Sequence, residues 1–171
     1  MFAKSFLSLF LFSSIFFFQL TWKTIKIDEK VSISFPSKVE KMVMDNKPVW
    51  LSDVDSASKC MIMITDMKKM GVDAKTLTEM LKRKETFKSI KNGILAGSTG
   101  SVALKESITT FKNYPAYYIE LDMKGEPNEF NKTYIMNIFI GAKMYSMTFA
   151  ETYQTKHVQQ RNKFFESFRV K

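Results

Sequence analysis

The sequence predicts an α+β domain, an antiparallel β-sheet with one inserted helix and one C-terminal helix packed on it. Three observations support this fold class. Segments with strand-like alternation of apolar and polar residues make up most of the chain after its first twenty residues. A single stretch of helical period interrupts them, and an amphipathic stretch lies near the end of the chain. This order of elements is typical of an antiparallel sheet covered by helices.

Alternation predicts the individual strands. In 31–35 (VSISF), apolar side chains occupy one face, and Pro36 ends the strand because it cannot donate a hydrogen bond to the ladder. Two segments, 59–67 and 133–140, are apolar on both faces, as expected of central strands covered on both sides. The predicted strands are 22–27, 31–35, 48–54, 59–67, 101–111, 117–123, 133–140 and 143–150.

The inserted helix is predicted from a capping motif. Residues 76–79 (TLTE) fit a capping box, in which the Thr hydroxyl and the Glu carboxylate bind free backbone N–H groups at a helix start. Apolar residues follow at helical spacing, and Asn92-Gly93 is predicted to stop the helix. With Gly97 and Gly100 following, we expect a flexible connection to the next strand.

A tight turn and a terminal helix complete the predicted fold. Gly141-Ala142 separates two strands and suits a type II′ hairpin, which needs glycine first. The terminal helix is expected at about 153–168. The residues expected on its buried side are Val158, Phe164, Phe165 and Phe168.

The first twenty residues predict where the protein goes. Lys4 is the only charge in 1–20, and 6–18 is a run of apolar residues and serines, shorter than the about 20 residues that span a membrane. This pattern is typical of a secretory signal peptide, so we expect an exported protein, periplasmic or secreted, with a single domain at 21–171. No small-residue cleavage pair precedes Trp22, which leaves an uncleaved N-terminal anchor as the alternative.

The charge of the chain limits the classes of partner that we expect. The net charge is +9, but only three of the 26 basic residues are arginines. Nucleic-acid sites favour the planar guanidinium, so a lysine excess in an exported protein argues against a nucleic-acid partner. The lysine excess favours solubility and mild attraction to anionic surfaces.

Cys60 is the only cysteine, so no intramolecular disulfide can form and packing must hold the domain together.

A family resemblance rests on three segments: the early VSISFP strand, Tyr-Pro-Ala-Tyr-Tyr at 114–118, and FFESF at 164–168. With the order of elements, they resemble the PsbP-like superfamily over roughly residues 22–170. This α/β/α sandwich includes exported bacterial DcrB-like proteins, the photosystem oxygen-evolving accessory protein and a nuclear regulator of the Ran GTPase. The resemblance implies an accessory or binding protein rather than an enzyme, and it transfers no functional residue to this chain.

The sequence offers little for catalysis or metal binding. His157 is the only histidine, so a His-based catalytic or metal site would need it, but its surroundings predict a solvated helix residue. Cys60 lies in the most apolar strand and is predicted to be a buried small hydrophobe, because a reactive thiolate needs a positive, partly exposed setting. We therefore expect no catalytic residue, no metal ion and no cofactor.

Two carboxylate pairs have strand spacing. Asp53/Asp55 and Glu120/Asp122 are each two residues apart, which places both members on one face of a strand at roughly 7 Å. The first pair is expected on a solvated face. The second lies beside Tyr118 on a face that another layer could cover. Tyr118, Glu120 and Asp122 are therefore a candidate polar site, and a hydrolase using this carboxylate pair is the third functional hypothesis.

The densest basic segment is a candidate site for an anionic surface. Lys84, Lys88 and Lys91 share one helix face at i, i+4 and i+7 spacing. Such a face could contact phosphate headgroups, although a solvated helix surface is the simpler interpretation. The full candidate set is Lys82, Arg83, Lys84, Lys88 and Lys91.

These features favour an exported, non-enzymatic accessory or binding protein of the cell envelope that acts through a protein partner. The alternative is a peripheral protein that binds anionic membrane surfaces weakly through the basic helix. Ionic strength separates the two hypotheses, because headgroup binding weakens steeply as salt rises.

Overall fold

The computed structural model describes residues 21–98, 100–123, 130–153 and 156–171. The predicted leader, 1–20, lies outside them, so its interpretation as a signal peptide or anchor stays a prediction. The elements in chain order are β1 (Lys23–Lys26), β2 (Val31–Phe35), β3 (Glu40–Met44), β4 (Lys47–Asp55), β5 (Ser58–Asp66), the 3₁₀ helix η1 (Met67–Met70), α1 (Ala74–Met80), α2 (Lys84–Ala96), β6 (Val102–Phe111), β7 (Tyr114–Asp122), β8 (Lys132–Ile140), β9 (Lys143–Glu151), α3 (Val158–Glu166) and β10 (Arg169–Val170).

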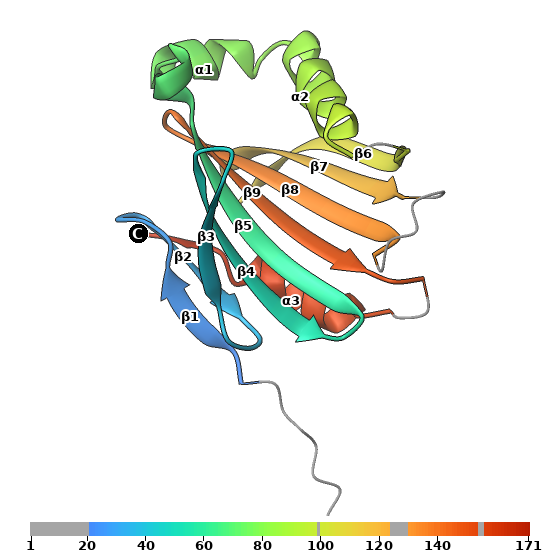
Figure 1. Ribbon diagram of the computed structural model, residues 1–171. Helices are drawn as coiled ribbons and strands as arrows, with labels where there is room; N and C mark the ends of the chain where they lie inside the picture. The colour runs from blue at the N-terminus through green and yellow to red at the C-terminus, as the bar shows by residue number, and fades with distance from the viewer. Residues whose placement is uncertain (1–20, 99, 124–129, 154–155) are drawn as a thin grey trace, which may run out of the picture.

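Seven strands form one antiparallel sheet in the order β3-β4-β5-β9-β8-β7-β6, and β1, β2 and β10 form a smaller sheet. Helices α1 and α2 pack on one face of the large sheet, and α3 packs on the other face together with the small sheet (Figure 1). The pair β5–β9 joins the N-terminal hairpins to the C-terminal meander. The predicted α+β class with an antiparallel sheet is confirmed.

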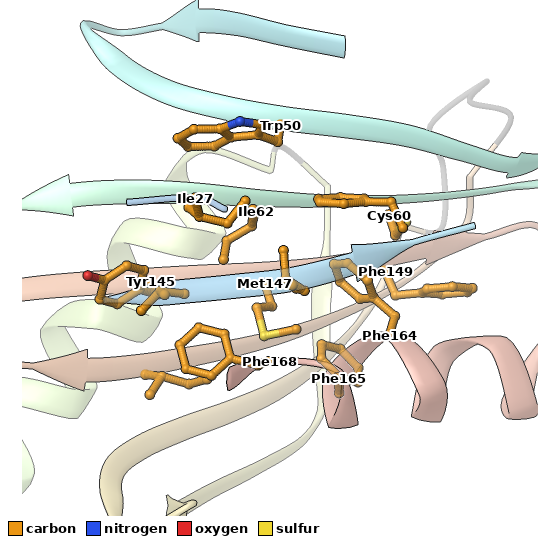
Figure 2. Close-up of a cluster of buried hydrophobic side chains, with 14 of the residues drawn as sticks. Ile27, Trp50, Cys60, Ile62, Tyr145, Met147, Phe149, Phe164, Phe165 and Phe168 are labelled. Atoms are coloured by element: carbon orange, nitrogen blue, oxygen red, sulfur yellow. The ribbon is translucent and has the colours of Figure 1, made fainter. Parts of the chain in front are cut away.

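The larger hydrophobic core lies between the large sheet, α3 and β2 (Figure 2). The ring of Phe164 stands 5.7 Å from that of Phe35 and 6.5 Å from that of Phe149, measured between centroids. The last phenylalanines of the chain thus hold α3 against the sheet. The side chains labelled in Figure 2 are Ile27, Trp50, Cys60, Ile62, Tyr145, Met147, Phe149, Phe164, Phe165 and Phe168.

A smaller core lies under α1 and α2. Phe87 of α2 packs on Tyr117 of β7 and Phe139 of β8, with ring centroids 5.8 and 6.4 Å away. Because side chains alternate along β7, Tyr117 faces α2, whereas Ala116 and Tyr118 face α3. β8 has a buried layer on each side, which explains why its sequence is apolar on both faces.

The predicted capping box is wrong. Asp73 caps α1, and its Oδ1 accepts a hydrogen bond from the backbone N–H of Thr76 at 2.7 Å. The segment also forms two helices rather than one, with a break between Met80 and Lys84. At this break the hydroxyl of Thr86 donates to the backbone carbonyl of Met80 at 2.6 Å, which stabilises the corner.

The predicted helix stop at Asn92-Gly93 is also wrong. Helix α2 continues through Gly93 to Ala96, and Gly97 is its C-cap residue. A glycine inside a helix costs only about 1 kcal/mol relative to alanine, which burial of Phe87 offsets. The connection to β6 therefore begins after Gly97.

Two strands, β3 and β10, have no counterpart among the predicted ones. Asp45 and Asn46 join β3 to β4 with φ values of 49° and 59°, the positive pair that a type I′ turn requires. This Asp-Asn pair is the signal that could have identified the hairpin. β10 has only two residues, too few for any periodicity, and it forms by pairing with β2.

The predicted two-residue turn at Gly141-Ala142 is confirmed. Gly141 has φ 60° and Ala142 stays outside the left-handed region, as a type II′ turn requires.

The last helix is shorter than predicted. α3 covers only part of the predicted range 153–168, of which 154–155 lies outside the described residues. Val158 is 45% exposed rather than buried, because it lies in the first turn of the helix. The three phenylalanines are buried as predicted.

Candidate functional site

β6 is the longest described strand, and it forms one edge of the large sheet. Eight of its ten residues are exposed, and the side chains of Leu104 and Ile108 are 57% and 54% exposed. An edge strand also carries backbone N–H and C=O groups that no neighbouring strand pairs. The surface around β6 therefore combines apolar side chains with a row of backbone hydrogen-bonding groups.

A groove of about 510 Å³ lies between β6 and α2. The predicted lysine row of α2 lines one side, Glu106 and Ile108 line the other, and Phe87 and Tyr117 contribute aromatic surface. We call it the α2 groove. Glu106 accepts hydrogen bonds from Tyr117 Oη at 2.6 Å and Lys91 Nζ at 3.0 Å, and these two contacts lower its pKa.

A second groove lies on the opposite face of the sheet, between β6 and α3. Its lining includes Lys105 and Thr109 of β6, Glu120 of β7 and Arg161 of α3, and we call it the α3 groove. Ser107 lines both grooves. The two grooves therefore meet at the edge of β6.

The structure brings two of the three predicted polar residues together. Tyr118 donates its hydroxyl to Glu120 Oε1 at 2.7 Å, and both line the α3 groove. Burial raises the pKa of Tyr118, and the hydrogen bond to Glu120 raises it further. Asp122 lies on the same face of β7 as predicted, but it is 5% exposed and accepts a hydrogen bond from Tyr153. Each carboxylate thus has its own tyrosine partner.

The break between α1 and α2 divides the predicted basic set. The row of three lysines lines the α2 groove, as their shared helix face predicts. Lys82 precedes the helix, and its Nζ lies 2.7 Å from Glu79 Oε1. Arg83 is the N-cap residue of α2. Only the lysine row therefore belongs to the groove.

A buried carboxylate, Glu151, ties α3 to the sheet. Its Oε1 accepts a hydrogen bond from Tyr134 Oη at 2.9 Å and lies 3.6 Å from Arg161, whose guanidinium stacks 3.8 Å from the Tyr134 ring centroid. Its Oε2 accepts from the backbone N–H of His157 at 2.9 Å. Burial raises the pKa of Tyr134, and the hydrogen bond to Glu151 brings it to about 12. The sequence shows no signal for this network, because its members come from separate elements.

His157 is not the solvated residue that the sequence predicts. Its side chain is 17% exposed, and Nε2 lies 2.7 Å from Asp55 Oδ2. Asp55 also accepts a hydrogen bond from Ser58 Oγ at 2.8 Å. The carboxylate therefore stands between the histidine and the serine, whereas a nucleophilic triad needs the histidine in the middle. This cluster positions the start of α3.

The pair Asp53/Asp55 does not share a face, contrary to the prediction. The pairing of β4 with β5 shifts register between these two residues. Asp53 Oδ1 lies 3.7 Å from Nζ of Lys59, its partner residue on β5. Asp55 Oδ2 instead contacts Nε2 of His157. A bulge of this kind interrupts the alternation on which the prediction depends.

Cys60 is a buried residue, as predicted. It is 1% exposed, and burial raises the pKa of its thiol. Within the described part of the chain, no three His, Cys, Asp or Glu residues are placed to hold a metal ion. None of the helices in that part is long and apolar enough to cross a membrane.

Away from the grooves, Asp28 connects the β1–β2 turn to β9. Its Oδ2 lies 2.7 Å from Lys143 Nζ and accepts a hydrogen bond from Tyr145 Oη at 2.6 Å. Its Oδ1 accepts from the backbone N–H groups of Lys30 and Val31, both at 2.9 Å. Burial alone would raise the pKa of Asp28, but these hydrogen bonds outweigh it and lower the pKa from 3.8 to about 2.

Replacing Asp28 by asparagine is expected to lower the free energy of unfolding at neutral pH by about 1 to 2 kcal/mol, a value reduced because Lys143 is 41% exposed. A lowered native pKa stabilises the fold above the unfolded value of 3.8, and this stabilisation disappears as the pH falls from 3.8 to about 2. Urea titrations across that range should therefore show the two proteins converging. Glu29→Gln, at the exposed neighbour, is the control, and a pH-independent difference would contradict the assignment.

Comparison with solved structures shows the fold. The chain is similar to the solution structure of cyanobacterial PsbP (CyanoP) from Synechocystis sp. PCC 6803, with a TM-score of 0.58 and 10% identity over 89% of this chain and 94% of that chain. The Ran-binding protein Mog1p of Saccharomyces cerevisiae aligns with a TM-score of 0.48 and 11% identity over 88% of this chain and 96% of that chain. No protein-family model and no curated protein matches the sequence. The chain has the PsbP-like fold, as the resemblance in its sequence implies.

Proposed function

We propose that this protein is an exported, non-enzymatic accessory protein that binds a protein partner through β6 and its two grooves. The observation that carries the proposal is the exposure of β6, whose apolar side chains Leu104 and Ile108 face solvent beside two grooves. Exposed apolar side chains grouped within a polar rim are typical of protein interaction sites. Export rests on the signal-like sequence of 1–20.

The lysine row also suits an anionic membrane surface, which is the alternative function. The geometry of the groove favours a protein instead. The lysine row lines a groove beside a strand edge, where a protein segment finds backbone partners that a headgroup does not need.

Site-specific photo-crosslinking in the native host tests this function. A photoreactive residue at Ile108 is expected to give one discrete adduct with a second protein. The matched control is Val43, an equally apolar residue that is 71% exposed on β3 at the other edge of the sheet. The proposal predicts no such adduct from position 43.

Two results would contradict it. The same adducts from both positions would indicate random collisions with exposed apolar side chains. Adducts with lipid but with no protein would favour the membrane-binding alternative.

A further inference from the structure

We infer that the edge of β6 accepts an extended segment of the partner as an additional strand, and that this segment carries acidic residues at alternate positions facing α2. The inference rests on the proposed function and specifies the chemistry of the partner. Strand addition uses the backbone groups of an open edge for affinity and alternate side chains for specificity.

The two edges of the large sheet differ in how open they are. β3 has five residues, whereas β6 has ten. Native edges are protected by short strands, lysines and bulges. On β6 the bulge between Ala103 and Lys105 protects only the first part of the strand. From Glu106 to Phe111 the pairing with β7 is regular, so no bulge protects the edge in this half of the strand.

The grooves on the two faces of the sheet match the alternation of an added strand. Successive side chains of a strand point to opposite faces. One set would enter the α2 groove beside Ile108, and the other would enter the α3 groove beside Thr109. Because Ser107 lines both grooves, a strand at this edge would reach both of them.

Charge differs between the grooves, and this sets the expected sequence of the added strand. In the α2 groove, three lysines face one carboxylate, Glu106, which Lys91 and Tyr117 already bind. The described residues offer no ion-pair partner to Lys84 or Lys88.

The positive and negative charges in the α3 groove are more nearly equal. Glu120 offsets Lys105, and Arg161 is directed to the buried Glu151. Acidic residues are therefore expected only on the side of the strand that faces α2, with uncharged residues between them. A helix rises about 1.5 Å per residue, so the lysine row extends over about 10 Å, enough for two acidic residues about 7 Å apart on a strand.

A second copy of the chain fits this edge less well. Two β6 strands paired around a twofold axis would place both α2 helices on the same face of the joined sheet. Their lysine rows would then lie side by side without added acidic groups. The net charge of +9 also opposes self-association.

A labelled peptide as long as β6, with alternating glutamate and threonine, is the probe. Fluorescence anisotropy is expected to show binding, and the lysine–threonine peptide is expected not to bind. Lys84→Glu with Lys88→Glu should weaken binding at least about tenfold, because two attractive contacts become repulsive. Lys23→Glu with Lys26→Glu, on exposed positions of β1, changes the net charge equally and should have little effect.

Hydrogen exchange then distinguishes strand addition from charge attraction. Alternate amides of β6 should exchange more slowly in the complex, because only every second N–H points outward. Ile108→Asp should abolish this protection, because it places a negative charge beside the acidic residues of the added strand, while Val43→Asp on β3 should leave it unchanged.

Three outcomes would overturn the inference. These are peptide binding without alternate protection, no binding at all, and a dimer in sedimentation that Ile108→Asp dissociates. The crosslinking experiment separates this inference from the proposed function. If the peptide does not bind, or binds without alternate protection, a discrete protein adduct at Ile108 would still support the proposed function and would reject only strand addition. Absence of the adduct, in contrast, would reject the function itself.

Discussion

Truncating Phe164 to alanine is expected to lower the free energy of unfolding by about 3 to 5 kcal/mol. Phe164 is fully buried, and its ring packs against those of Phe35, Phe149 and Phe165. The substitution removes a large apolar side chain and leaves a cavity between α3 and the sheet, which the surrounding rings can close only in part. Chemical denaturation followed by circular dichroism measures the change.

Val158→Ala is the matched control on the same helix. Its side chain is 45% exposed, so the expected change is below about 0.5 kcal/mol. Equal losses at the two positions would mean that α3 does not dock through its phenylalanines. The loss expected for Phe164→Ala is a large part of the stability of a typical domain, so this variant could fail to fold. Phe164→Leu is the milder variant, which should still fold.

Replacing Glu151 by alanine is expected to cost about 3 kcal/mol, the loss that follows when one member of a buried ion pair is removed. Glu151 is 2% exposed, and its removal leaves Tyr134 and Arg161 without their shared acceptor. The backbone N–H of His157 also loses its partner at the start of α3. The amides of α3 should therefore exchange faster with solvent, in addition to the loss measured by denaturation.

Two variants make this experiment specific. Glu151→Gln keeps an acceptor oxygen and should recover part of the loss, because the hydrogen bonds need an acceptor more than a charge. Glu40→Ala, at an exposed position of β3, should change stability by less than about 0.5 kcal/mol. A Glu151→Ala protein as stable as the Glu40→Ala protein would show that the network does not hold α3.

Local patterns predicted the strands well because alternation is a local signal. VSISF became β2 over the predicted residues, and the Gly141-Ala142 turn formed as expected. The helix boundaries failed because several residues can cap a helix. Asp73 provides a carboxylate three residues before the backbone N–H of Thr76, and that arrangement prevailed over the later TLTE motif.

The candidate site was predicted only in part, because local spacing shows which residues share a face but not which distant residues contact them. The lysine row of α2 follows from helical spacing, and the shared face of Tyr118 and Glu120 follows from strand spacing. The partners of these residues could not be predicted. His157 has charged and polar neighbours in sequence, yet Asp55 approaches it from a strand about a hundred residues earlier in the chain.

The sequence by itself determined the class of fold, the central strands and the basic row, because each depends on the spacing of residues within one element. Only the tertiary structure decided that β6 is an edge, that α2 and α3 stand on opposite faces of it, and that two grooves meet along it. The position of a strand in a sheet depends on which segments pair, and pairing joins residues far apart in the chain. The central strands could be recognised because both of their faces are apolar, but the polar residues of β6 fit a solvated face of a paired strand as well as an open edge, so no local pattern could have marked β6 as an edge.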